Sequence, residues 1–123
     1  MILLDTHALL WLHQGKPRTR VLAKRGTRLY ASPISLLELK LLVEAGRLRL
    51  RGDATVTEVF SDDRWLVDEP PALSWFSAAL DLGWARDPFD RMLVAHARLR
   101  GWKLATADSV ILEHVPAAGR IEL

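Results

Sequence analysis

The chain has 123 residues, half of them hydrophobic, with five tryptophans, no cysteine and a net charge of +2. These values predict a single domain with a core over residues 1–123. They exclude a disordered chain, a disulfide scaffold, a thiolate metal site and a membrane span, so any metal ion would need carboxylate or histidine ligands.

Short apolar runs alternate with helical patterns in the first half of the chain. We expect strands over residues 1–4 and 28–32, a helix over 7–14 capped by Asp5 or Thr6, and a basic helical stretch near 18–25. The segment "PISLLELKLLVEAG" (33–46) predicts a strong helix. Its leucines are too numerous for a narrow apolar stripe, so we expect this helix to be largely buried.

The second half continues the alternation. Its sequence predicts a short helix within 53–63, a strand over 64–69, a helix over 70–83, a helix over 88–100 stopped by Gly101, a strand over 103–107, a short helix over 109–114 and an edge strand over 120–123. Strands that alternate with helices imply right-handed crossovers and a parallel sheet covered on both faces.

Four acidic residues fall near the predicted carboxyl ends of strands. Asp5 directly follows the first strand, Asp108 follows "KLATA", and Asp90 lies in the first turn of the helix over 88–100. Glu38 lies near the start of the helix after the second strand. Because ligands bind beyond the carboxyl ends of parallel strands, all four side chains can face one edge of the sheet.

Each acid also has a local structural explanation. Asp5 and Asp108 can cap helices, and Asp87 stands before Pro88 as a helix N-cap does. "SLLE" (35–38) fits a capping box. Several carboxylates crowded at one edge repel one another and raise their pKa values, which favours a bound Mg²⁺ or Mn²⁺ over the capping reading alone.

Other common catalytic patterns are missing from the sequence. The four histidines have no metal-ligand spacing, and His96, within a helix rich in alanine and leucine, is expected to have a core or boundary role. Neither a GxSxG nucleophile elbow nor a glycine-rich phosphate loop occurs. The sequence therefore does not support a Ser-His-Asp hydrolase or a nucleotide-binding loop.

The charge is distributed unevenly along the chain. Residues 1–51 contain ten Lys or Arg and three acids, whereas residues 52–123 contain seven Lys or Arg and twelve acids. The basic clusters over 16–28 and 46–52 predict either a face that binds a polyanion or ordinary solvated helix faces.

Four motifs, in order and spacing, resemble the PIN-domain ribonucleases of the VapC toxin type. They are "LLDTHALLWL", "YASPISLLELKLLVEAGRLRL", "RDPFDRMLVAHA" and "LATAD", and together they extend over nearly the whole chain. The resemblance implies an α/β class, with a three-layer α/β/α PIN-like fold and a central parallel sheet. It also implies a metal-dependent endoribonuclease that leaves 5′-phosphate and 3′-hydroxyl ends and is neutralised by a cognate antitoxin.

The resemblance also assigns roles to individual residues. Asp5, Glu38, Asp90 and Asp108 match the family's acids, which hold Mg²⁺ or Mn²⁺ and carry the catalysis. Thr6 and Thr106 match hydroxyl positions that orient the metal ligands or water, and Asp87 remains a helix cap with a possible outer role at the metal. The candidates for contact with the RNA phosphates are Arg86 and Arg91.

The remaining expectations concern partners and location. We expect a homodimer that binds RNA and an antitoxin, without a membrane association. The apolar N-terminus lacks a basic leader and is interrupted by Asp5, which predicts no signal peptide and a cytoplasmic location. The alternative function is a non-catalytic PIN-like module that binds RNA or protein, although all four acid positions are filled.

Overall fold

A computed structural model describes residues 1–123 and contains one five-stranded sheet. All neighbouring strands are parallel and lie in the order β3-β2-β1-β4-β5. The strands are β1 (Ile2–Leu4), β2 (Leu29–Ala31), β3 (Leu66–Val67), β4 (Lys103–Thr106) and β5 (Arg120–Glu122). The predicted parallel sheet, including its C-terminal edge strand, is therefore present.

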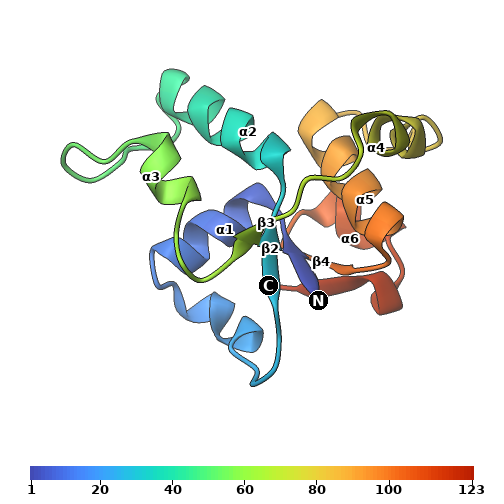
Figure 1. The fold of residues 1–123 in the computed structure, drawn as a ribbon, viewed down its shortest axis with the longest axis horizontal. Helices are drawn as coiled ribbons and strands as arrows, with labels where there is room; N and C mark the ends of the chain where they lie inside the picture. The colour runs from blue at the N-terminus through green and yellow to red at the C-terminus, as the bar shows by residue number, and fades with distance from the viewer.

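Helices cover both faces of the sheet, as Figure 1 shows. No helix combines the length and apolar character that crossing a membrane requires. The α-helices are α1 (Thr6–His13), α2 (Pro33–Glu44), α3 (Val56–Phe60), α4 (Ala72–Ala79), α5 (Pro88–Arg100) and α6 (Ser109–His114), and the 3₁₀ helices are η1 (Pro17–Leu22) and η2 (Ala117–Gly119).

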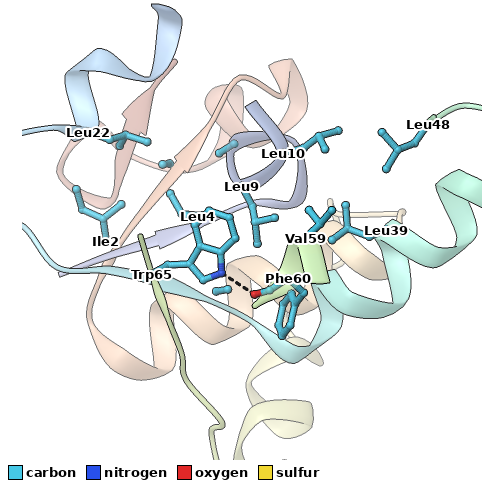
Figure 2. Close-up of a cluster of buried hydrophobic side chains, with 13 residues drawn as sticks. Ile2, Leu4, Leu9, Leu10, Leu22, Leu39, Leu48, Val59, Phe60 and Trp65 are labelled. Carbon is cyan, nitrogen blue, oxygen red and sulfur yellow. Dashed lines mark hydrogen bonds between the residues drawn. The ribbon is translucent and has the colours of Figure 1, made fainter. Parts of the chain in front are cut away.

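The side chains of β1 alternate between two cores, one on each face of the sheet. Leu4 and Leu9 belong to a cluster that also contains Trp65, whose indole N–H donates a 2.9 Å hydrogen bond to the Phe60 carbonyl (Figure 2). Leu3, between two residues of that cluster, instead joins the cluster formed by α4, α5 and α6. This alternation produces the three layers, because successive strand residues point to opposite faces.

The order of the strands fixes where a ligand can bind. From β1 the chain builds outward through β2 and β3, and then returns to add β4 and β5 on the other side of β1. The direction of winding therefore reverses between β1 and β4. In open parallel sheets the crevice at such a reversal, beyond the carboxyl ends of the strands, is the usual ligand site.

The basic helical stretch predicted near 18–25 is present as the 3₁₀ helix η1, which begins at a proline. Two details of the predicted elements were wrong. The strand predicted over 64–69 is reduced to two exposed residues of β3. Helix α2 is not largely buried, since Ser35 and Leu39 are its buried residues, whereas Leu37 and Leu41 are exposed.

Candidate functional site

An acidic cavity lies at the point where the winding of the sheet reverses. It has a volume of about 340 Å³ and is open to solvent. Asp5 enters it from the end of β1 and Asp108 from the segment after β4, while Asp90 comes from α5 and Glu38 from α2. The fold therefore brings together all four acids that were expected to face one edge, and it adds Asp87 to them.

Three of these acids cap helices as well as lining the cavity. The Ala8 N–H donates a 2.7 Å hydrogen bond to Asp5 Oδ1, and the Ile111 N–H donates a 3.0 Å hydrogen bond to Asp108 Oδ1. Asp87 Oδ1 accepts two hydrogen bonds at the start of α5. Capping and a role in the cavity are thus compatible, because the backbone binds only one oxygen of each carboxylate.

Burial and repulsion between carboxylates raise the pKa values of Asp90 and Glu38, the two acids of the cavity that do not cap a helix. Burial, followed by the charges of Asp87 and Asp108, raises the pKa of Asp90 to about 7. Burial also raises the pKa of Glu38, although the nearby Thr6 hydroxyl opposes the shift. Neither carboxylate has an ion-pair partner in the chain.

Asp5 is the most buried carboxyl of the cavity. Burial raises its pKa, while the Thr106 hydroxyl and the Ala8 N–H act in the opposite direction. Thr106 is itself completely buried and accepts a 3.0 Å hydrogen bond from the Asp108 N–H. Thr106 therefore interacts with both acids that follow the neighbouring strands β1 and β4.

The capping box predicted for "SLLE" does not form. Helix α2 begins at Pro33, with Ser32 as its N-cap, so Ser35 already lies inside the helix. The hydroxyl of Ser35 instead lies 3.0 Å from the hydroxyl of Thr6, and both side chains are buried. Tertiary packing against α1 replaces the local cap and leaves Glu38 in the cavity.

The cavity also contains residues that sequence reasoning did not assign to the site. His7 and Trp11, on α1, have ring centroids 5.8 Å apart, and Arg47 approaches from the segment after α2. His7 and Trp11 are four residues apart in the sequence and follow Asp5 closely, so they lie on one face of α1. This spacing is the sequence signal that could have placed them in the site. Arg47 belongs to the basic cluster over 46–52, which predicted a face for a polyanion but did not place this arginine beside the acids.

The two predicted phosphate contacts have different surroundings. Arg86 is exposed and lines a smaller cavity that shares Asp87 and Asp90 with the acidic one. Arg91 lies outside the acidic cavity, and its Nε–H donates a 2.8 Å hydrogen bond to the Ala85 carbonyl. Arg91 therefore holds the segment before α5 in place.

A Ser-His-Asp arrangement does occur, but it is structural. His96 Nδ1 lies 2.9 Å from Ser32 Oγ and Nε2 lies 2.7 Å from Asp68 Oδ2. Ser32 and His96 are completely buried, so no substrate can reach the hydroxyl. The expected core role of His96 is confirmed.

Comparison with known proteins identifies the fold. The sequence model described as the PIN domain matches residues 2–117. The chain belongs to the PIN domain family. Ribonuclease VapC22 from Mycobacterium tuberculosis (strain ATCC 25618 / H37Rv) is 27% identical to this PIN domain over 118 residues, covering 92% of this chain and 91% of the relative.

Two solved structures share the fold of this PIN domain. A toxin-antitoxin complex from Klebsiella pneumoniae has a TM-score of 0.70 and 15% identity, with full coverage of both chains. VapBC2 from Rickettsia felis, bound to a DNA fragment from its promoter, has a TM-score of 0.69 and 16% identity, covering 100% of this chain and 99% of that chain. The predicted α/β fold and the resemblance to VapC-type proteins are confirmed.

The donor set of the acidic cavity fits a hard divalent cation. Its candidate ligands are carboxylate oxygens, and they have no ion-pair partners. No three histidine or acidic side chains lie close enough together to enclose an ion. Mg²⁺ and Mn²⁺ keep several water ligands, so one or two carboxylates of this solvent-open cavity, the acidic cup, are enough to hold such an ion.

Substitutions at Asp87 separate its capping role from its charge. Asp87→Ala removes both and is expected to lower the free energy of unfolding by about 0.5 to 2 kcal/mol. Asp87→Asn keeps a good cap and should lower it much less. Urea denaturation of both variants checks the difference, and equal losses would contradict the capping role.

Proposed function

We propose that this PIN domain is a metal-dependent endoribonuclease toxin that hydrolyses RNA phosphodiester bonds and is neutralised by a cognate antitoxin. The gathering of Asp5, Glu38, Asp90 and Asp108 in one solvent-accessible cavity carries the proposal. The match to a VapC ribonuclease and the shared fold with toxin-antitoxin complexes support it. The proposed location is the cytoplasm, where the protein would meet both the RNA and the antitoxin.

The same four carboxylates would hold Mg²⁺ or Mn²⁺. The ion would make water more acidic and offset charge on the phosphate oxygens. Backbone hydrogen bonds hold two of these carboxylates in position. N–H groups donate to Oδ1 of Asp5 and of Asp108, so Oδ2 of each residue is the oxygen that would face the ion. The buried hydroxyls of Thr6 and Thr106 orient the neighbouring acids.

Metal-dependent cleavage tests the proposal directly. The purified chain is incubated with structured RNAs in Mg²⁺, in Mn²⁺ and in EDTA, and the ends of the products are mapped. We expect internal cuts with 5′-phosphate ends that need the metal ion. RNA binding without any cleavage would instead identify a non-catalytic binding module.

The basic residues of the first half are positioned for RNA binding. All ten Lys and Arg side chains of residues 1–51 are exposed, and none forms an ion pair with an acid. We expect RNA affinity to fall with salt, with a log-log slope of roughly −0.7 for each phosphate contact of a single strand. Fluorescence anisotropy over a salt series measures this slope, and a salt-independent affinity would contradict the proposed RNA-binding face.

Charge-reversal substitutions identify which arginine side chains contact the RNA phosphates. Arg49→Glu and Arg51→Glu should each weaken binding and make the slope shallower by roughly 0.7. Lys103→Glu is the matched control, because Lys103 is exposed but begins β4, at the end of the sheet opposite the acids.

An apolar stripe on α4 supports the proposed homodimer. Leu73 and Phe76 of α4, and Leu80, the C-cap residue directly after it, are 82%, 58% and 77% exposed. We expect Leu73→Lys combined with Leu80→Lys to convert a dimer into a monomer in sedimentation experiments. A wild-type chain that stays monomeric at micromolar concentrations would contradict this interface.

A further inference from the structure

A second cavity adjoins the acidic cup, on the side formed by α5 and α6. It has a volume of about 290 Å³, and its wall includes Trp84, Arg86 and Val110. Asp87 and Asp90 line both cavities, so the two lie next to each other along these two aspartates. A chain molecule with one unit in the acidic cup can therefore place its neighbouring unit here.

The tryptophan in this wall is held in a fixed orientation. The Trp84 ring, in the connection between α4 and α5, stacks on the His114 ring at a centroid distance of 4.5 Å and an angle of 2°. His114 is fixed in turn, since its Nδ1–H donates a 2.9 Å hydrogen bond to the Val110 carbonyl. The indole is half-buried, so part of it remains accessible to a ligand.

An arginine side chain without an ion-pair partner, Arg86, lines the same cavity. Arg86 is exposed and forms neither an ion pair nor a side-chain hydrogen bond within the chain. A fixed aromatic ring next to an unpaired guanidinium matches the chemistry of a nucleotide, which has a flat base and an anionic phosphate. A base in a duplex is already stacked and paired, so this combination favours an unpaired nucleotide.

We propose that Trp84 stacks an unpaired base of the RNA next to the phosphate that occupies the acidic cup, while Arg86 contacts the adjoining phosphate. This inference rests on the proposed ribonuclease function and names a subsite for it. A paired base would have to leave its helix to reach the ring.

The test measures binding of a fluorescent single-stranded hexaribonucleotide with phosphorothioate linkages, which slow its hydrolysis, in Mg²⁺, which offsets the charge of the carboxylates in the cup. Trp84→Leu should weaken binding about tenfold, and Trp84→Tyr should restore most of the affinity because it keeps an aromatic face. Trp102→Leu is the matched control. Trp102 is also half-buried and stacked, at 4.3 Å from Tyr30, but it follows the C-terminal end of α5 and lines neither cavity.

A hexanucleotide made of abasic residues separates stacking from an effect on folding. Trp84→Leu and the wild type should bind this probe equally, since it offers no base to the ring. Equal affinity of the two proteins for the normal hexaribonucleotide would overturn the subsite. An equal loss of affinity for both probes would also overturn it, as would a wild type that binds neither.

Cleavage assays in Mg²⁺ keep this inference distinct from the proposed function. With an unpaired RNA substrate, Trp84→Leu should raise KM about tenfold and change kcat little. Binding that depends on Trp84 without any cleavage would contradict the ribonuclease and support the subsite. Normal cleavage with an unchanged KM in Trp84→Leu would contradict the subsite and support the ribonuclease.

Discussion

Asp90→Asn is expected to abolish metal-dependent RNA cleavage while stabilising the metal-free protein at pH 8. Asparagine keeps the shape of the side chain but removes the charge that a metal ion would bind. Loss of groups that only orient metal ligands costs 10- to 100-fold, so loss of a ligand should reduce cleavage at least about 100-fold. Added Mn²⁺ should raise the melting temperature of the wild type and have little effect on the variant.

The gain in stability follows from the raised pKa of Asp90, about 7 in the folded chain against 3.8 for an ordinary aspartate. Between these pH values the folded protein holds a proton that the unfolded chain has released. Stability therefore falls as the pH rises through this range, and the full penalty is present at pH 8. Asp90→Asn removes this penalty. With allowance for solvent screening, the substitution should raise the free energy of unfolding by about 1 to 3 kcal/mol.

Asp87→Asn is the matched control for this experiment. It also removes one negative charge from the acidic cavity, but at a residue assigned to capping α5. We expect its cleavage to survive and its pH dependence of unfolding to weaken less than in Asp90→Asn, because burial contributes more than the Asp87 charge to the raised pKa of Asp90. Full activity in Asp90→Asn would contradict the proposed metal site, and loss of metal binding in Asp87→Asn would show that the two aspartates have been assigned the wrong roles.

His96→Leu is expected to cause a large loss of stability, about 2 to 4 kcal/mol, with a fall in melting temperature on the order of 10 °C. Burial would raise the pKa of Asp68, but hydrogen bonds from Arg100 and His96 outweigh it and lower this pKa. The ionised carboxylate only accepts hydrogen bonds, so Nε2 of neutral His96 donates to it. Nδ1 then accepts a hydrogen bond from Ser32.

Leucine preserves the approximate volume but leaves the Ser32 hydroxyl buried without a partner. Adding Ser32→Ala to His96→Leu removes that unpaired group and should recover about 1 kcal/mol. Urea denaturation of the single and double variants measures this recovery. If His96→Leu alone unfolds with wild-type stability, the network does not stabilise the fold.

The same histidine gives the stability a pH dependence. Burial lowers the pKa of His96, so the folded chain keeps this ring neutral at pH values where an unfolded histidine takes up a proton. Stability should therefore fall as the pH drops below about 6.5, and His96→Leu should weaken this dependence. Cleavage well below the melting temperature should be retained, because neither His96 nor Ser32 lines the acidic cavity.

The sequence by itself determined the order of the elements and most of their bounds. Helix α5 begins and ends where its local signals place it, between the cap Asp87 and Gly101, whose φ of 70° suits glycine. The caps Asp5 and Asp108 were equally predictable. Such features depend on residues within about four positions of one another, and the sequence displays these directly.

Only the tertiary structure decided which side chains meet. Ser35 looked like a capping residue, but packing of α2 against α1 directs its hydroxyl to Thr6, 29 residues away in the chain. Likewise, nothing near Arg47 in the sequence places it beside Asp5, and nothing near Trp84 places it on His114. These contacts join segments that are distant in sequence, so they are set by the winding of the sheet and the packing of its helices, which local patterns do not encode.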